Sequence, residues 1–122
     1  MKILLAEDAE DNQVLMTRLL RGAGAQVDLA VNGVEAVAKA LAHEYALILM
    51  DIQMPEVDGY EATARLRDGG YDRPIVALTA HAFREERERC LRAGCDGHLT
   101  KPVDRRTLLE SVKHYVGRGP LQ

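Results

Sequence analysis

The chain has 122 residues, which suits one domain with a hydrophobic core of its own. With 47% hydrophobic and 29% charged residues, its composition is that of an ordinary globular protein. A net charge of −3 and an aromatic content of 4% give no reason to expect a nucleic-acid partner. No apolar stretch is long enough for a membrane span, and no signal peptide precedes the first predicted strand. We therefore expect a cytoplasmic protein without membrane insertion.

Short apolar runs and helical periodicities alternate along the chain. Strands are predicted at Lys2–Ala6, Gln26–Val31, Ala46–Met50, Pro74–Thr79 and Gly97–Thr100. Helices are predicted at Asp11–Ala23, from the cap Asn32 to about Ala42, from the cap Asp58, at Ala82–Ala93, and from the cap Asp104. Five such units predict a parallel sheet with helices on both faces, a three-layer α/β sandwich. One domain would span residues 1–117, and residues 118–122 would form a tail or the start of a linker.

A single carboxylate, Asp51, stands at the end of the central predicted strand. The unbroken apolar run before it is typical of a strand that is covered on both faces. Pro55 and Gly59 then turn the chain into a loop. Open α/β sheets bind their ligands at the carboxyl ends of their strands, which favours a functional Asp51. On its own, however, an acid at this position is equally consistent with a helix cap.

Polar side chains also stand at the ends of other predicted strands. Glu7 and Asp8 follow the first strand, Thr79 ends the fourth, and Lys101 follows the fifth. Because the carboxyl ends of parallel strands share one edge, three carboxylates would converge there and raise one another's pKa. A hard divalent cation relieves this repulsion. Oxygen ligands with room for water suit Mg²⁺, so we expect Mg²⁺ as the cofactor.

The remaining groups at this edge suit phosphoryl chemistry. Lys101 adds a positive charge opposite the acids, and Thr79 adds a hydroxyl donor. Together with a metal ion they would position a phosphoryl group and neutralise its charge. The carboxylate of Asp51 is then the predicted nucleophile, since it can form an aspartyl-phosphate.

Four motifs, in order, carry a family resemblance: residues 4–8 (LLAED), 49–55 (LMDIQMP) with Asp58-Gly59, 77–80 (ALTA) and 99–102 (LTKP). In this order and spacing, the chain resembles the response-regulator receiver domains of two-component phosphorelays over essentially its whole length. The resemblance implies a flavodoxin-like fold, whose five parallel strands lie in the order 2-1-3-4-5 with five helices.

The resemblance also implies roles for individual residues. Asp51 would be the phosphoacceptor, and Glu7, Asp8, Asp51 and the backbone carbonyl of Gln53 would hold Mg²⁺. Thr79 and Lys101 would contact the phosphoryl oxygens. Residues 11–13 (DNQ) and 79–82 (TAHA) are most similar to receivers attached to hybrid sensor histidine kinases.

One position departs from the family pattern. Three residues before Lys101 the family usually carries Tyr or Phe, whose ring moves inward as the Thr hydroxyl turns toward the phosphate; here the residue is His98. An imidazole is smaller, more polar and able to titrate near neutrality. We therefore expect His98 to give a smaller or pH-sensitive switch, with the phosphorylation chemistry intact. A second histidine, His81, is placed near the mouth of the pocket by its position two residues after Thr79.

Two further features receive structural interpretations. The charged run at residues 84–89 (REERER) has opposite charges at helical spacing, as in Glu85 and Arg89, and is interpreted as a solvated helix face. Cys90 and Cys95 show no metal-binding spacing and are interpreted as reduced packing residues.

Rival classes fit the sequence less well. A haloacid-dehalogenase-type phosphatase also uses an Asp nucleophile and Mg²⁺, but it needs a second Asp where this chain has Gln53. A dinucleotide-binding domain would show G-x-G-x-x-G after the first strand, where residues 7–11 read EDAED. A receiver that serves only as a protein-binding module would have lost part of the acid, Thr and Lys set, which is complete here.

The expected function is that of a phosphoryl-accepting signalling domain. It would take the phosphoryl group from a phosphohistidine of a sensor histidine kinase or a histidine-containing phosphotransfer protein, hold it on Asp51, and lose it slowly to water. It would catalyse these two steps on itself, as a monomer, without stand-alone multi-turnover activity. Both a single-domain regulator and the C-terminal part of a hybrid sensor histidine kinase fit the sequence.

Overall fold

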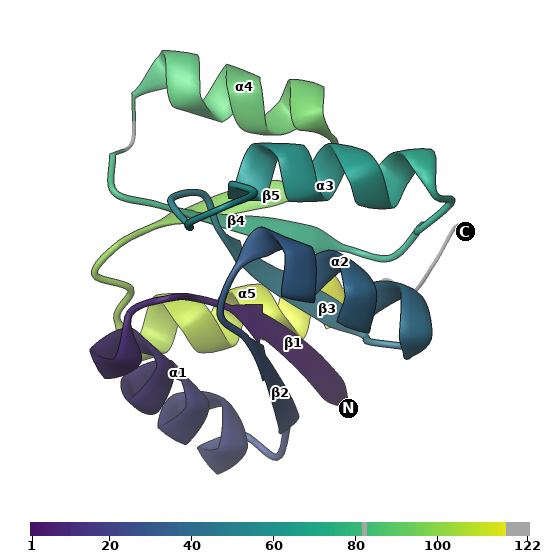
Figure 1. The fold of residues 1–122 in the computed structure, drawn as a ribbon. Coiled ribbons are helices and arrows are strands. Elements are labelled where there is room, and N and C mark those ends of the chain that lie inside the picture. The colour runs from purple at the N-terminus through teal and green to yellow at the C-terminus, as the bar shows by residue number, and fades with distance from the viewer. Residues whose placement is uncertain (82, 117–122) are drawn as a thin grey trace.

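The chain forms one five-stranded parallel sheet with helices on both faces, as the computed structural model of residues 1–81 and 83–116 shows (Figure 1). The elements are β1 (Lys2–Ala6), α1 (Glu10–Gly22), β2 (Gln26–Ala30), α2 (Gly33–Ala42), β3 (Leu47–Asp51), α3 (Gly59–Asp68), β4 (Ile75–Thr79), α4 (Arg84–Ala93), β5 (Gly97–Thr100) and α5 (Arg105–Val116). The strands lie in the order β2-β1-β3-β4-β5, which confirms the predicted fold class and strand order.

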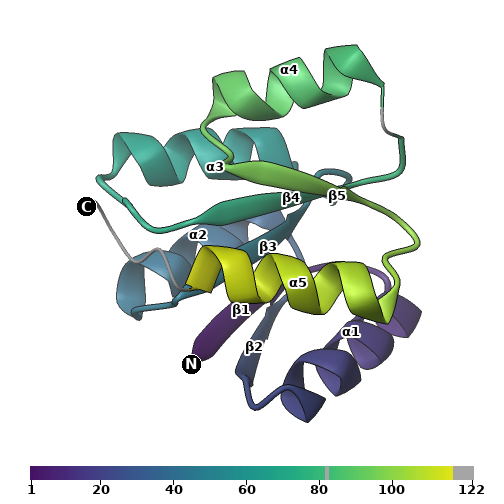
Figure 2. The same ribbon diagram turned by 180° about the vertical axis from the view of Figure 1, so that it is seen from behind.

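The helices divide between the two faces of the sheet. Buried side chains of α2, α3 and α4 pack in one hydrophobic cluster, and those of α1 and α5 pack in a second cluster on the opposite face (Figures 1 and 2). The central strand β3 serves both clusters, because its side chains alternate: Leu47 and Leu49 face α1 and α5, whereas Ile48 and Met50 face the other layer. A strand covered on both faces explains its unbroken apolar run.

The predicted helix caps at Asn32, Asp58 and Asp104 are confirmed. The side-chain oxygen of Asn32 accepts a hydrogen bond from the backbone N–H of Glu35 at 2.8 Å. The Asp58 carboxylate accepts from the N–H of Glu61 at 2.9 Å, and the Asp104 carboxylate accepts from an N–H in the first turn of α5. These caps fix where α2, α3 and α5 begin, at the same edge of the sheet as the strand ends.

The predicted start of the fourth helix was too early. The helix α4 begins at Arg84, and Phe83 before it has an extended backbone with φ −67° and ψ 146°. Helical spacing in the sequence continues into this loop, but the backbone there is extended, so the apolar pattern overran the helix. Residue 82 and the predicted tail at residues 118–122 lie outside the described residues.

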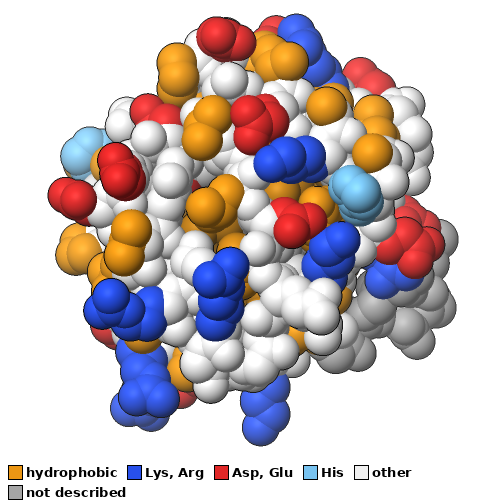
Figure 3. All heavy atoms as spheres, turned by 60° about the horizontal axis from the view of Figure 1, so that its bottom comes forward, with side chains coloured by type: hydrophobic (Ala, Val, Ile, Leu, Met, Phe, Trp, Pro, Cys, Tyr) orange, Lys and Arg blue, Asp and Glu red, His pale blue; other side chains and the backbone are white. Residues whose placement is uncertain are grey.

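The surface mixes apolar and charged groups. Figure 3 shows one face, on which hydrophobic side chains are dispersed among acidic and basic ones. The strongly exposed apolar residues include Val14 and Leu15 on α1 and Phe83 and Leu91 at α4. Within residues 1–81 and 83–116, no helix has both the length and the apolar character needed for a membrane crossing.

Candidate functional site

The fold brings the predicted acids together at the carboxyl edge of the sheet. Glu7 and Asp8 follow β1, and Asp51 ends β3, the strand next to it. One carboxylate oxygen from each of the three residues lies within 4.8 Å of the others. Glu7 and Asp51 are almost fully buried, at 0% and 2% exposure, whereas Asp8 is exposed at the rim. The site is therefore an acidic cluster that is buried at Glu7 and Asp51 and exposed at Asp8, and it is called the acidic pocket below.

Lys101 supplies the positive charge in this pocket. Its Nζ lies 3.0 Å from Oδ2 of Asp51 and 3.4 Å from Oε1 of Glu7. Its backbone N–H donates to the carbonyl of Thr79 at 2.7 Å, which ties the loop after β5 to the end of β4. Burial alone would lower the pKa of Lys101, but the hydrogen bond to Asp51 and the charges of both acids outweigh it and raise the pKa above its ordinary value. The ammonium therefore stays charged.

Glu7 shows why the pocket suits a cation. Its Oε2 accepts a hydrogen bond from the N–H of Ala9 at 3.1 Å, which holds the carboxyl group in place. Burial, followed by a hydrogen bond with Asp51, raises the pKa of Glu7 to about 7. Two buried acids and a third at the rim thus face a single ammonium, and the charge is not balanced. The clustered oxygen donors fit a hard divalent cation such as Mg²⁺.

The backbone around Asp51 is held by close packing. Its Oδ1 accepts a hydrogen bond from the N–H of Gln53 at 3.0 Å, and the N–H of Gly59 donates to the carbonyl of Ile52 at 2.9 Å. A Cβ atom at Gly59 would lie only 2.3 Å from the carbonyl oxygen of Asp51, so only glycine fits there. These contacts orient the Asp51 carboxylate. The role of the Gln53 carbonyl as a metal ligand stays a prediction.

Thr79 lies at the site, with its hydroxyl turned into the following loop. It ends β4 with 2% exposure, and its Oγ1 donates a hydrogen bond to the backbone carbonyl of His81 at 2.8 Å. The imidazole of His81 is exposed and stacks on Phe83, with ring centroids 5.2 Å apart. No local sequence pattern predicts the bond from Thr79 to the His81 carbonyl, because it depends on the path of the loop. The predicted contact of Thr79 with a phosphoryl group would require this bond to break.

His98 lies on β5, opposite Ala77 of β4, at the floor of a hollow between β5 and α4. The charged groups lining this hollow are Arg84, Arg87, Glu88 and Asp96. Partial burial, and then the charge of Arg87, lower the pKa of His98 below its ordinary value. At neutral pH the imidazole is therefore uncharged, and its titration moves to the acidic side of the range expected from the sequence.

The interpretations of the cysteines and of the charged run are both confirmed. Cys90 and Cys95 are free, buried thiols, and burial raises the pKa of both, that of Cys95 to about 12, which confirms them as packing residues. On α4 the ion pair joins Arg84 to Glu88 at 2.9 Å, while Arg89 lies over the ring of Tyr60. Glu85 and Arg89 are both exposed, as are Arg84 and Glu88, which confirms the solvated helix face; the ion pair itself is made by Arg84 and Glu88.

The sequence is similar to those of known signalling proteins. The chain is 44% identical over 126 residues to hybrid signal transduction histidine kinase G of Dictyostelium discoideum, covering 99% of this chain and 4% of the kinase. It is 38% identical to the polar-differentiation response regulator DivK of Brucella anthropi, covering 94% of this chain and 95% of the regulator. The chain thus spans only a small part of the kinases that it matches and nearly all of DivK.

Solved structures of receiver domains are similar to this chain in both fold and sequence. The receiver domain of the sensor histidine kinase PA1611 from Pseudomonas aeruginosa, described with a magnesium ion in its active-site cleft, has a TM-score of 0.89 and 41% identity, with 95% and 97% of the two chains covered. The receiver domain of Saccharomyces cerevisiae Ssk1, crystallised with the histidine phosphotransfer protein Ypd1, gives 0.90 and 32%, with 99% and 92% covered.

The sheet order and the acidic pocket at its carboxyl edge define a flavodoxin-like domain of the kind found in these neighbours. The model of the response regulator receiver domain family matches residues 3–113, and the chain belongs to that family. It is a receiver domain of two-component signalling systems.

Proposed function

We propose that this receiver domain accepts a phosphoryl group on Asp51 from a phosphohistidine of a partner protein and loses it slowly to water. The observation that carries the proposal is the buried Asp51 carboxylate, which has the Lys101 ammonium 3.0 Å away and the acids Glu7 and Asp8 within 4.8 Å. Phosphoryl transfer needs this combination of a positioned oxygen nucleophile and concentrated positive charge.

The residues divide the chemistry between them. An Asp51 oxygen attacks phosphorus in line, and the bond from phosphorus to the histidine nitrogen breaks, with its electron pair going to the imidazole. Lys101 keeps its charge beside the group being transferred and offsets the charge that Asp51 gains. Thr79 exchanges its bond with the His81 carbonyl for one to a phosphoryl oxygen.

Mg²⁺ fits the same pocket. We propose that Glu7, Asp8, Asp51 and the carbonyl of Gln53 hold the ion, which neutralises phosphoryl oxygens when it is bound. Supporting this, the three carboxylates converge, and the neighbour PA1611 is described with magnesium in its cleft. Because Glu7 and Asp51 are buried beneath the rim, their charges act with little screening by solvent.

The proposed partner is a sensor histidine kinase or a histidine-containing phosphotransfer protein. The helix α1 begins three residues after Glu7 and carries the exposed apolar residues Val14 and Leu15 beside the pocket edge. Such residues offer a partner a docking face close to Asp51. The complex of Ssk1 with Ypd1 is a precedent in a neighbour. We propose a monomer that acts in the cytoplasm, where the two free thiols would stay reduced.

The larger context has two candidates. The kinase relatives favour a receiver that forms part of a hybrid sensor histidine kinase, whereas DivK favours a single-domain regulator. Alone, the domain would catalyse its own phosphorylation and dephosphorylation only. The flanking coding sequence decides between them, because a kinase core upstream would place the domain in a hybrid kinase.

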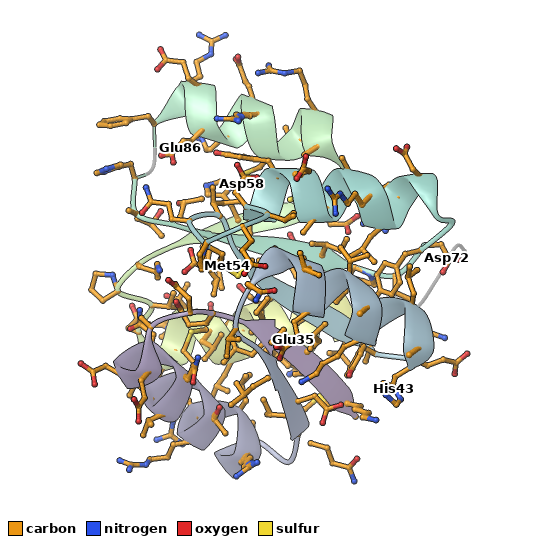
Figure 4. All side chains as sticks on the ribbon, viewed as in Figure 1. Glu35, His43, Met54, Asp58, Asp72 and Glu86 are labelled. Atoms are coloured by element: carbon orange, nitrogen blue, oxygen red, sulfur yellow. The ribbon has the colours of Figure 1, made fainter. Side chains whose placement is uncertain are left out.

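The test is labelling with a small phosphodonor. With acetyl phosphate and Mg²⁺, the chain should gain one acid-stable, base-labile acyl phosphate, observed as a single mass increase. Asp51→Asn should remove it, whereas Asp72→Asn, an exposed carboxylate far from the pocket in Figure 4, should leave it unchanged. Equal labelling of Asp51→Asn, or full labelling in excess chelator, would contradict the proposal.

A further inference from the structure

The short loop from β1 to α1, residues 7–9, carries two of the three acids of the acidic pocket (Figure 1). These acids are Glu7 and Asp8, and they face Asp51 at the end of the neighbouring strand β3. A small rotation of the loop backbone would move both carboxylates away from Asp51. The convergence of the three acids therefore depends on the contacts that hold this loop.

Glu7 is held through its backbone as well as its side chain. Its N–H donates to the carbonyl of Ala30, at the end of β2, at 2.9 Å. Its carbonyl oxygen accepts a hydrogen bond from the side-chain amide of Gln13, whose Nε2 lies 2.6 Å away. Gln13 belongs to the start of α1. The end of β1 is thus tied to β2 on one side and to α1 on the other.

The Glu7 carbonyl depends on the Gln13 amide for its hydrogen bond. Glu7 has 0% exposure, so bulk water does not reach this oxygen. Among the described residues, no backbone N–H donates to it. A buried carbonyl without a partner is costly. If the amide were removed, the loop would have to shift until the carbonyl found another donor.

Helix α1 also lacks the side-chain cap that fixes the start of α2, α3 and α5. Its N-cap residue is Ala9, which makes no side-chain capping bond. Gln13 supplies a different restraint, because its backbone N–H donates to the carbonyl of Ala9 at 3.0 Å while its side chain holds the carbonyl of Glu7. One residue therefore fixes both ends of the loop, with Asp8 between them.

We propose that Gln13 is a positioning residue for the Mg²⁺ site, and that its amide holds the loop so that Glu7 and Asp8 face Asp51. The inference rests on the proposed function, because the ion concerned is the one proposed to bind these acids. Gln13 acts through the Glu7 backbone and leaves the ligands themselves to the carboxylates. Groups that orient metal ligands in this way typically change metal affinity about 10–100-fold.

The test is a Mg²⁺ titration of the full chain without phosphodonor, followed by the amide chemical shifts of Asp8 and Gln53. Gln13→Met keeps the length of the side chain and removes its N–H donors, so the Kd for Mg²⁺ should rise about tenfold. Arg67→Lys is the control. It disturbs hydrogen bonds to backbone carbonyls near the amino ends of β4 and β5, so it should lower stability and leave the Kd for Mg²⁺ unchanged.

Labelling by acetyl phosphate gives a second readout. In Gln13→Met, the Mg²⁺ concentration at half-maximal labelling rate should rise about tenfold. At saturating Mg²⁺, the rate should return to within about twofold of that of the parent chain, because the metal ligands and Asp51 are all present. A side chain that only stabilised the fold would change neither the Kd nor the half-maximal concentration.

Equal Mg²⁺ affinity in Gln13→Met and the parent chain, or an equal loss of affinity in Arg67→Lys, would overturn the inference and leave the proposed metal site standing. A parent chain that binds no Mg²⁺ would reject the metal site, and the inference with it. The two failures can therefore be told apart.

Discussion

The ammonium of Lys101 lies 3.0 Å from the Asp51 carboxylate, although fifty residues separate the two in sequence. The contact joins β3 to the loop after β5 across the end of β4. Under the proposed function, the positive charge that would receive a phosphoryl group is therefore in place before one arrives. Lys101 thus has two tasks: it stabilises a pair of buried acids, and it links the pocket to β5.

Replacing Lys101 should separate these tasks. Lys101→Ala leaves Glu7 and Asp51 buried without their cation, so the free energy of unfolding without Mg²⁺ should fall by about 1–3 kcal/mol. Added Mg²⁺ should recover much of this loss. The amide shift response to a beryllofluoride mimic should also shrink at β5. Urea unfolding with and without Mg²⁺ gives the first result, and NMR gives the second. The exposed Lys113→Ala is the control, and a Lys101 variant that behaves like it would refute both roles.

Glu7 predicts a pH dependence of stability without Mg²⁺. Its folded-state pKa of about 7 lies above the value of 4.5 for an unperturbed carboxyl, so the folded state holds the proton more tightly. Its contribution to the free energy of unfolding is therefore present below pH 4.5 and is lost as the pH rises through 7. Because Mg²⁺ binds the ionised carboxylate, stabilisation by Mg²⁺ should grow over the same span.

Urea unfolding midpoints at several pH values with chelator measure this decline. In Glu7→Gln the decline should be largely absent, since the amide does not titrate. Asp104→Asn is a matched control, because its carboxyl has the opposite shift: capping bonds from Thr107 lower its pKa. The contrary outcome is a parent chain whose stability rises steadily across this pH span, with the same profile as Glu7→Gln. That result would show that Glu7 keeps an ordinary pKa.

Arg67 predicts a large loss of stability away from the pocket. It donates to the backbone carbonyls of Gly94, Tyr71 and Arg73 at 2.8–2.9 Å and to the Asp96 carboxylate at 2.8 Å. The planar guanidinium of Arg67 makes these bonds as a fork of N–H donors, which the single ammonium of lysine cannot reproduce. Arg67→Lys should therefore lower the free energy of unfolding by about 2–4 kcal/mol.

The control for Arg67 lies on the same helix. Arg65 makes an exposed ion pair with Glu61, so Arg65→Lys should cost less than about 0.5 kcal/mol. Thermal or urea unfolding of both variants makes the comparison. Equal, small losses would mean that the loops around β4 and β5 hold together without the Arg67 fork.

The contrast between Arg67 and Asp51 shows what the sequence could predict. Asp51, Glu7 and Lys101 were found because each stands at the end of a predicted strand, and parallel strands carry their ends to one edge. Helix caps were found for a similar reason, since they act within three residues. Arg67 gave no such signal. Its partners are mostly backbone carbonyls, and all of them lie beyond its own helix, where their positions depend on how the loops return.

The same limit applies at the pocket mouth. The bond of the Thr79 hydroxyl to the His81 carbonyl and the contact of the Arg89 guanidinium with the Tyr60 ring follow from side-chain rotamers and the approach of α4 to α3. Hydrophobic periodicity does not encode these details. It also overran the start of α4, because apolar and charged residues continue through the extended backbone at Phe83. Local sequence patterns therefore identified the residues of the site, whereas the contacts around each of these residues could be established only from the structure.

The last prediction concerns His98 and the signal that leaves the site. Burying the imidazole further, as the usual aromatic ring is buried in this family, would desolvate a polar group and bring less apolar area in return. A ligand shifts a population only by its differential contacts with the two states. Beryllofluoride should therefore cause a small rearrangement of α4, β5 and α5 in the parent chain, and His98→Tyr should enlarge it.

The pH range of this effect follows from the structure. Because burial and Arg87 lower the pKa of His98 below 6.5, the imidazole is neutral at pH 7, and the response should be nearly constant above that pH. It should change only on the acidic side, where protonation adds a charge beside Arg87. Amide shifts with and without beryllofluoride, recorded between about pH 5.5 and 8, span the transition. His43→Tyr, an exposed histidine at the far end of α2 (Figure 4), is the control. A full, pH-independent rearrangement in the parent, to which His98→Tyr adds nothing, would show that the imidazole replaces the aromatic ring completely.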